Sequence, residues 1–349
     1  MANFENETPF GVSVMPSTDR NGLNLLLVVV AAQFELPEPG SDDSPPRVAP
    51  TQEPPPMAEE YVGEPGQSSI RRDGQSSYTK PATDIYVCGD ACASHGHPTT
   101  AMSVNIRVGP CAVDLRVFGD RVWERAAALG VRPSDPAPFV KMPLVWERAY
   151  GGVAKSSTVQ RPAFEPRNPI GCGLETDRQD AIGKPVPNIE DPRQPLGGIT
   201  DRPRPVGVGP IARHWQPRVS YAGTYDDAWK RQRAPLWPLD LDERFFCSAP
   251  SYLQASPHLT GGEAVVLQGL HPNGPIRFRL PILRLRSLTR FLDDDPTQRA
   301  LVLDGVLFET DLHRLTMYYR ASVPTALGFI KHQQTSVHLL RPGEDEISR

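Results

Sequence analysis

The sequence predicts a mainly β protein of antiparallel, sandwich-like sheets with long irregular Gly/Pro-rich loops and a few short helices. The 349 residues include 39 prolines and 28 glycines. Proline is about twice as frequent as in an average protein, and long helices do not tolerate it. Apolar and polar residues alternate in several short runs, which is typical of half-buried strands. Turn dipeptides such as Gly-Pro and Asn-Gly separate these runs.

The first element is an apolar run rich in β-branched residues, Leu23–Leu36, which ends at Pro37. It is too short and too abruptly bounded for a buried helix, so we expect a strand inside a sheet. Alternation over 102–117 predicts a hairpin that turns at Gly109-Pro110. A second hairpin is expected over 264–280, where Asn273-Gly274 would supply the positive φ angles of a tight turn.

The last third of the chain indicates a closing meander and little helix. Strands are expected at Leu301–Leu303, Val306–Glu309 and Leu312–Arg320, with Asp304-Gly305 as a turn. The helices expected in the whole chain are short and lie at Asp226–Arg233, Val122–Leu129 and Thr325–His332.

Composition predicts one elaborated domain with an insertion. Residues 1–36 form its N-terminal strand region, 37–60 a proline-rich insertion or linker, 61–340 the main β-rich domain and 341–349 a C-terminal tail. Eight prolines fall within 37–56, so we expect this stretch to be extended and poorly ordered. Residues 151–220 are also rich in Gly and Pro, but aromatic residues in and after them favour an ordered, irregular layer over a sheet.

Charge and hydropathy exclude several classes of function. The net charge of -4 provides no basic surplus for a phosphate backbone, so no nucleic acid partner is expected. The longest apolar run, Leu25–Ala32, is far short of the roughly 20 residues that cross a bilayer, and we expect no membrane association. With no export signal, a cytoplasmic location is expected. The five cysteines are an odd, scattered set and are expected to be reduced thiols.

Four residues of the types that bind zinc lie within ten positions, at Cys88, Cys92, His95 and His97. A zinc-stabilised binding module is therefore one alternative. The spacing argues against it, because structural zinc sites usually have two short ligand pairs separated by a longer loop. A strand end followed by a polar turn explains the same residues, so no metal or other cofactor is expected.

Paired carboxylates give a second alternative, a carbohydrate-active hydrolase that uses Glu190, Asp240 or Asp242 as general acid and base. Arg244 follows Asp242 by two residues, so a structural salt bridge is the competing interpretation. No GxSxG nucleophile elbow is present in the sequence, which argues against a serine hydrolase.

Aromatic and arginine residues are frequent in the loops. Such residues dominate protein–protein hot spots, because each combines a large contact area with a polar group. They can equally pack an irregular layer, and both interpretations stay open. The residues are Trp146, Arg148, Tyr150, Trp215, Arg218, Tyr221, Tyr225, Trp229, Arg244, Phe245 and Phe246.

Eight segments in order resemble one known family. They are KPATDIYVCGDA from Lys80, LRVFGDRVW from Leu115, PFVKMPLVWERAYGG from Pro138, RNPIGCG from Arg167, PNIEDP from Pro187, GPIARHWQPRVSYAGTYDDAW from Gly209, PLDLDERFFCSAP from Pro238 and LTGGEAVVL from Leu259. The chain resembles the type VI secretion effector adaptors or chaperones, long known only as a domain of unknown function and encoded beside the needle-tip spike and its toxin cargo.

The resemblance implies a non-enzymatic, cytoplasmic adaptor of a Gram-negative bacterium that binds a toxin effector and helps to load it onto the spike protein. Cys88 and Cys92 depart from the small residues common in the family, and the insertion after Pro37 is longer than expected. Tyr221 and Trp229 are added as interaction candidates from their residue type. The family's recurrent positions fall here on Arg148, Tyr150, Arg167, Asn168, Trp215, Arg218, Gly223, Thr224, Asp240, Asp242, Arg244, Phe245, Phe246 and Gly262.

Overall fold

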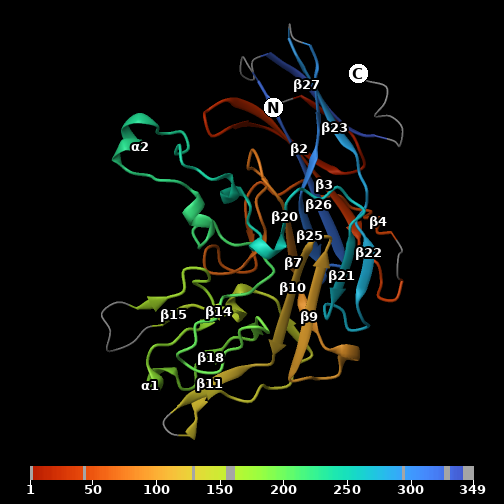
Figure 1. Ribbon diagram of the computed structural model, residues 1–349. Coiled ribbons are helices and arrows are strands. Elements are labelled where there is room, and N and C mark those ends of the chain that lie inside the picture. Colours follow the sequence, from red (N-terminus) through yellow and green to blue (C-terminus); the bar gives the residue numbers. More distant parts are fainter. Residues whose placement is uncertain are drawn as a thin grey trace.

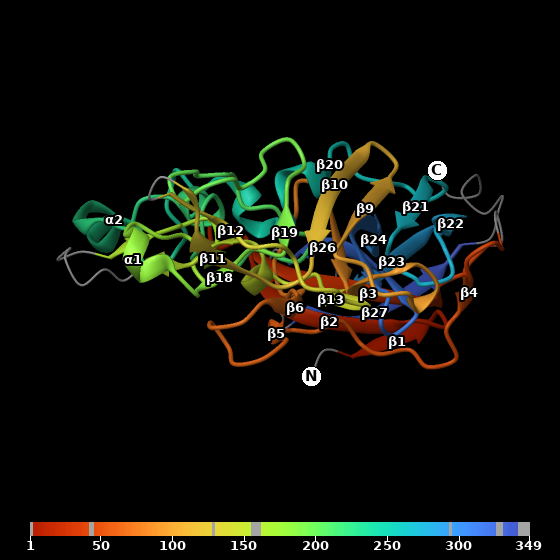
Figure 2. The ribbon, with the colours of Figure 1, turned by 90° about the horizontal axis from the view of Figure 1, so that it is seen from below.

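Two large β-sheets, layered face to face, form the centre of the protein (Figures 1 and 2). The computed structural model describes residues 3–41, 45–127, 130–154, 162–292, 295–325 and 331–340. The sheets of this described part are mostly antiparallel, as the sequence predicts. Its helices are all too short to traverse a lipid bilayer.

The larger sheet is built around the strand predicted at Leu23–Leu36. This strand is buried on both faces and pairs with β26 along its whole length, which confirms a position inside the sheet. The pairs are antiparallel except β25 with β7. In spatial order the strands are β2 (Gly11–Thr18), β3 (Asn24–Glu35), β26 (Arg314–Pro324), β25 (Val302–Glu309), β7 (Thr83–Cys88) and β20 (Gln254–Ala255), with β4 (Arg47–Val48) also pairing with β3.

The second large sheet contains both predicted hairpins, β9–β10 and β21–β22, joined by pairing of β9 with β21. Its apolar face shares one core with the larger sheet, where the rings of Phe278 and Phe308 meet edge to face at 6.3 Å. Its strands, in spatial order, are β19 (Ile189–Glu190), β10 (Cys111–Phe118), β9 (Ala101–Val108), β21 (Ala264–Gln268) and β22 (Ile276–Arg279).

A four-stranded sheet brings the two ends of the described chain together. Its strands, in order, are β1 (Phe4–Glu7), β27 (His332–Leu339), β23 (Leu285–Phe291) and β24 (Thr297–Ala300), and β1 runs parallel to β27. Beside the large sheets lies the irregular layer, residues 130–154 and 162–253 together with β11. A second apolar cluster around Trp123 and Tyr150 packs inside it.

Short elements connect and support these layers. The strands are β5 (Glu60–Tyr61), β6 (Ile70–Arg72), β8 (Asp90–Cys92), β11 (Arg121–Arg125), β12 (Val131–Pro133), β13 (Lys141–Pro143), β14 (Tyr150–Gly151), β15 (Val153–Ala154), β16 (Ala163–Phe164), β17 (Cys172–Gly173) and β18 (Pro185–Val186). The helices are η1 (Ser94–Gly96), η3 (Trp146–Arg148), α1 (Arg178–Ala181), η4 (Arg218–Tyr221), α2 (Asp227–Gln232), η5 (Glu243–Phe246) and η6 (Ser251–Leu253).

The helix expected over Val122–Leu129 is wrong. Its first half is strand β11, which pairs with both β12 and β18. Burial alternates along it, because Arg121 and Trp123 face inward while Val122 is exposed. In a run this short, the spacing of apolar residues fits both a helix and a strand. The backbone forms a strand because it can pair with β12 on one side and β18 on the other. Residues 128–129 lie outside the described chain.

Two predicted turns also differ. Asp304-Gly305 lies inside β25. The pairing of β25 with β26 shifts register between Leu303 and Gly305, and the strand continues without a turn. The β21–β22 connection spans residues 269–275, and positive φ angles occur at Gly269 and Gly274 but not at Asn273. Because this connection is longer than two residues, the tight Asn-Gly turn geometry is not needed.

The helix predicted at Asp226–Arg233 is confirmed as α2. Its N-cap is Asp226, whose carboxylate accepts a hydrogen bond from the Trp229 amide. Of the helix expected over Thr325–His332, residues 326–330 lie outside the described chain, and His332 begins strand β27.

The described part of the proline-rich stretch, residues 37–41 and 45–56, lies along the sheet. β4 pairs with the end of β3, and the Gln52 side chain exchanges hydrogen bonds with the Gln33 backbone at 2.9 and 3.0 Å. Glu53 lies so close to Gly11 that a Cβ there would overlap its carbonyl oxygen. Strand pairing and the Gln52 side chain therefore attach this stretch to β3 near its C-terminal end.

The structure separates two tryptophans that the sequence groups together. Trp215 is 2% exposed and packs against Trp146, whereas Trp229 is partly exposed and contacts Tyr225. We expect Trp215→Ala to lower the free energy of unfolding by about 3–5 kcal/mol, because it leaves a cavity. Trp229→Ala should cost no more than about 1–2 kcal/mol. Equal losses in urea unfolding of the two variants would contradict this division.

Candidate protein-binding site

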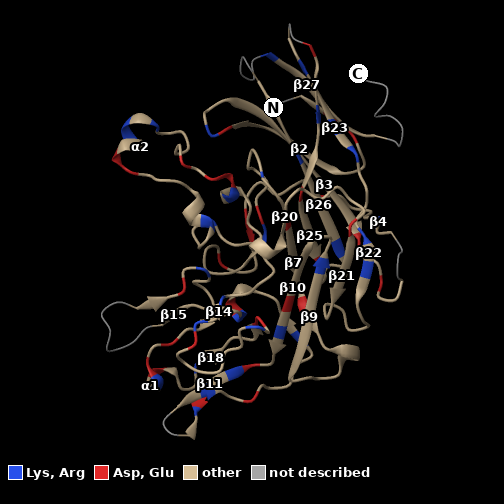
Figure 3. Ribbon diagram, viewed as in Figure 1, with Lys and Arg blue, Asp and Glu red and all other residues tan. Residues whose placement is uncertain are grey.

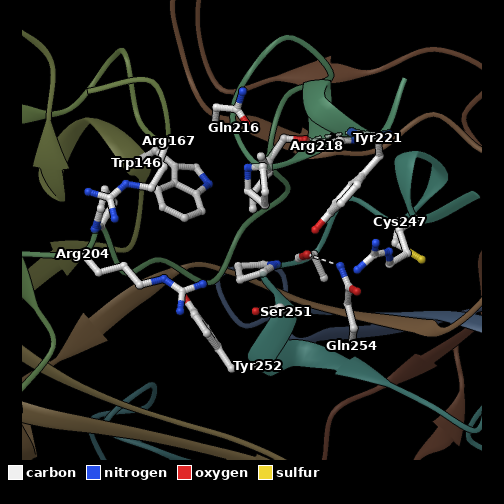
Figure 4. Close-up of a pocket in the computed structure, with 16 residues that line it drawn as sticks. Trp146, Arg167, Arg204, Gln216, Arg218, Tyr221, Cys247, Ser251, Tyr252 and Gln254 are labelled. Carbon is white, nitrogen blue, oxygen red and sulfur yellow. Dashed lines mark hydrogen bonds between the residues drawn. The ribbon is translucent and has the colours of Figure 1, made fainter. Parts of the chain in front are cut away.

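Motif residues from distant parts of the sequence meet around one hollow in the irregular layer (Figure 4). Of the residues named from the sequence, Arg167, Arg218, Tyr221 and Arg244 line it, together with Trp146. The hollow encloses about 150 Å³ and is open to solvent. It lies between η3, the chain at Arg204, the η4–η5 region and the η6–β20 segment.

Arg218 forms the back of the hollow and is 2% exposed. Its Nε donates to the Phe245 carbonyl at 2.8 Å and its Nη1 to the Ile211 carbonyl at 2.7 Å. The same guanidinium is 3.9 Å from the Asp73 carboxylate. Arg218 thus connects η4 to two other segments of the irregular layer and compensates a buried negative charge.

Asp84 on β7 fixes the wall of the hollow to the large sheet. Its buried carboxylate accepts hydrogen bonds from Lys80 Nζ at 3.1 Å and from the Tyr86 hydroxyl at 2.7 Å. It also accepts the backbone amides of Ser248 at 3.0 Å and Ala249 at 3.2 Å. Because Ala249 lines the hollow, its position is set by a charged group at the sheet centre.

Asp73 completes this buried network. Its carboxylate accepts a hydrogen bond from Ser248 Oγ at 2.8 Å and lies 3.5 Å from Lys80 Nζ. Burial by itself would raise the pKa of Asp73, but Arg218, Lys80 and the Ser248 hydroxyl outweigh it and hold that pKa below its ordinary value.

Tyr221 and Arg244 form the outer rim. The Arg244 guanidinium carbon lies 4.4 Å from the centre of the Tyr221 ring, in cation–π contact. Asp242 caps η5 through the Arg244 amide at 2.9 Å and also accepts Arg244 Nε at 2.9 Å. Hydrogen bonds from the Arg244 side chain, more than any other cause, hold the pKa of Asp242 below its ordinary value.

Arg167 and Trp146 form the opposite side. Arg167 makes a two-pronged contact with Glu165, with Nε–Oε1 at 2.7 Å and Nη2–Oε2 at 2.6 Å. Trp146 donates from Nε1 to the Pro210 carbonyl at 3.0 Å, and its main-chain carbonyl accepts from Asn168 Nδ2 at 2.8 Å. Both side chains are therefore fixed in place before any partner binds.

Five further named residues, which do not line the hollow, are buried and hold the fold: Tyr150, Asn168, Trp215, Phe245 and Phe246. Arg148 is half-buried and binds Asp120 at 3.0 Å and Asn188 at 2.9 Å. At these six positions the side chains pack or hydrogen-bond within the irregular layer, which is the second of the two interpretations given from the sequence.

Trp229 and Asp240 lie on the α2 arm, residues 222–240, which projects from the body (Figure 1). Asp240 closes the base of the arm by accepting the Thr224 amide at 3.0 Å and the Thr224 hydroxyl at 2.7 Å. Gly223 adopts a φ of 84° there, and a Cβ would lie 2.7 Å from Pro238. Gly262, by contrast, lies between β20 and β21, away from the arm and the hollow.

The three carboxylates considered for hydrolysis each have a local partner. Glu190 is buried against Arg121, and its second oxygen accepts the Leu196 amide at 3.1 Å. Asp240 binds Thr224, which is the main cause that lowers its pKa, and Asp242 binds Arg244. A carboxylic acid that acts as general acid needs a raised pKa. The pKa values of Asp240 and Asp242 are instead lowered.

The four residues considered for zinc are not gathered around one point in the described part of the chain. Within the described ranges, no three His, Cys, Asp or Glu residues are placed to hold one ion. The Cys88 thiol donates to the Arg71 carbonyl at 3.0 Å, and burial raises its pKa to about 12. A metal-binding cysteine needs the thiolate form, which this burial disfavours.

Sequence reasoning did not single out several other lining residues, among them Arg204, Ser251, Tyr252 and Gln254. Arg204 reaches toward the middle of the hollow in Figure 4. It lies in the segment RPRPVGVGP, whose alternating prolines indicate an extended chain but do not show what faces it. The other three lie on η6 and β20, in a stretch that none of the eight motif segments covers.

Comparison with known proteins identifies the family. The model for DUF2169, described as an uncharacterized protein conserved in bacteria, matches residues 21–320. The chain belongs to this family. The matched range contains all eight motif segments and every residue that lines the hollow. No curated protein and no solved structure matches the chain.

The buried network predicts an acid-dependent stability. The folded pKa of Asp73 is depressed, so its stabilising effect is complete above its unfolded pKa of about 3.9 and is lost as the pH falls through the folded value. Asp73→Asn should lower the free energy of unfolding at pH 7 by about 3–5 kcal/mol, because Lys80 and Arg218 lose a buried partner.

Urea unfolding between about pH 6 and pH 2 measures this. The stability of Asp73→Asn should fall less steeply below about pH 4 than that of the wild type. The exposed Asp135→Asn serves as the control and should retain the wild-type slope. Identical slopes in all three proteins would show that Asp73 carries no linked proton.

Proposed function

We propose that this DUF2169 protein is a non-enzymatic adaptor that binds a type VI secretion toxin effector in the bacterial cytoplasm and helps to load it onto the spike. The observation that carries the proposal is the hollow, where arginine and aromatic residues of separate motifs meet on an open surface. Arginine, tyrosine and tryptophan are the residue types that dominate protein-binding hot spots.

The rigidity of the hollow supports a binding role. Arg167 and Arg244 are each held by a carboxylate two residues earlier, and Tyr221 is covered by Arg244. Side chains that are ordered before binding lose little conformational entropy on contact with a partner. The rim is therefore suited to recognise a protein surface without rearrangement.

The residues that the three candidate carboxylates contact also favour an adaptor over a hydrolase. Glu190 is engaged by Arg121 beneath the surface, and Asp240 and Asp242 hold the arm and η5 in place. Each carboxylate thus has a structural role that explains its presence. The type of secretion system and the class of cargo, a toxin effector, come from the motif resemblance.

Binding to the purified toxin and spike encoded beside the gene tests the proposal. We expect the wild-type chain to co-elute with both in size-exclusion chromatography. Tyr221→Ala should weaken toxin binding at least about tenfold, the effect of a hot spot of 1.4 kcal/mol or more. Phe4→Ala, an exposed aromatic on β1, is the matched control and should bind like the wild type. Absence of binding to either purified protein would overturn the proposal.

A further inference from the structure

A second hollow adjoins the first, and the two together are called the groove below. Both hollows are lined by Arg204, Pro205 and Tyr252. The second hollow extends from this junction to Arg193 and to Asp114 on β10. The groove therefore runs from the Tyr221–Arg244 rim, past Arg204, to the edge of the second large sheet.

Three arginines of the groove are held by the same local device, an acidic residue two positions before the arginine. The pairs are Glu165–Arg167, Asp191–Arg193 and Asp242–Arg244. In each pair the carboxylate accepts the arginine's own backbone amide, at 3.0, 2.9 and 2.9 Å, and also its side chain. Acidic and basic residues consequently alternate along the loops of the irregular layer (Figure 3).

This device fixes the direction of each guanidinium. In Arg167 and Arg193 the carboxylate occupies the Nε and Nη2 donors, and Nη1 is not part of that contact. A guanidinium has five N–H donors, so an arginine held in this way can still donate to a second acceptor. The arginines are thus pre-ordered to receive an acidic group.

Arg204 differs from these three. Its side chain is exposed, and among the described residues its guanidinium makes no hydrogen bond or ion pair. It extends beside Tyr252 in the middle of the groove (Figure 4). Of the described residues that line the first hollow, four are arginines and none is acidic. Three of the four have a carboxylate partner of their own, and Arg204 is the one for which no ion pair exists among the described residues.

We infer that this groove binds an extended acidic segment of a partner protein, with a carboxylate of that segment on Arg204. The inference rests on the proposed function, because it names the chemistry of the partner at the same site. Carboxylates pair with guanidinium groups through two parallel hydrogen bonds, as Glu165 does with Arg167. Tyr221 and Tyr252 provide ring surface for the rest of the segment.

A nucleic acid is the less suitable occupant. The acidic partners Glu165, Asp191 and Asp242 accompany the arginines along the groove and would repel a continuous phosphate backbone. An acidic peptide with apolar or neutral residues between its carboxylates carries fewer negative charges past these partners and is repelled less. An extended chain advances about 3.3 Å per residue, so such spacing is available within a few residues.

The test uses the full chain and a fluorescein-labelled decapeptide of alternating glutamate and leucine, followed by fluorescence anisotropy. A peptide with glutamine in place of glutamate is the control ligand. We expect the glutamate peptide to bind and Arg204→Gln to weaken it at least about tenfold, which is the loss of one charge-assisted hydrogen bond. Arg277→Gln, which removes an equally exposed arginine on β22, should leave binding unchanged.

Several results would overturn the inference. They are equal binding of the glutamine peptide, no binding of the glutamate peptide at about 1 mM, or equal effects of Arg204→Gln and Arg277→Gln. Tighter, Arg204-dependent binding of a fluorescein-labelled thymidine decanucleotide would assign the groove to nucleic acid instead. Arg204→Gln changes an exposed side chain, so its thermal melting should match the wild type and exclude a folding defect.

The outcome is separable from that of the proposed function. If the wild-type chain binds toxin and spike while Arg204→Gln retains full toxin affinity, the adaptor role stands and the acidic-segment inference fails. If the glutamate peptide binds through Arg204 but neither toxin nor spike does, the inference stands and the type VI role fails.

Discussion

The architecture depends on a buried charge at the centre of the large sheet. Asp84 on β7 has no exposed surface, and it is stable there because Lys80, Tyr86 and two backbone amides donate to it. A buried carboxylate without such partners would cost several kcal/mol. Its need for donors attaches the loop at Ser248 to the sheet, and that loop positions η5 on one side and the turn before β20 on the other. The irregular layer is thereby tied to the sheets.

Within the irregular layer, side chains replace the regular hydrogen bonds that proline and glycine prevent. Asn168 and Arg218 are both buried, and each donates to backbone carbonyls of other segments. Glycine contributes where chains approach closely, since a Cβ at Gly207 would lie 2.9 Å from the Trp146 ring. Backbone groups of a buried loop must find partners, and here polar side chains supply them. A stretch whose composition resembles disorder therefore builds a defined wall.

This construction explains why the groove is both polar and fixed. Each acidic residue that precedes an arginine by two positions caps a local turn and orients the arginine at the same time. The turn and the binding group form one unit, so the short loops that carry them need no long helix for support. A similar local contact stabilises the α2 arm, where Asp240 accepts hydrogen bonds from Thr224 at the base.

The sequence alone determined the elements whose signal is local: β3, the two hairpins and the capped helix α2, because alternation, β-branching and capping act over a few neighbouring residues. The tertiary structure decided the rest. It made β11 a strand through two pairing partners, buried Arg218 and Trp215, and left Arg204 at an open junction. Whether an arginine is buried, paired or available depends on segments far away in the chain, and no local pattern contains that information.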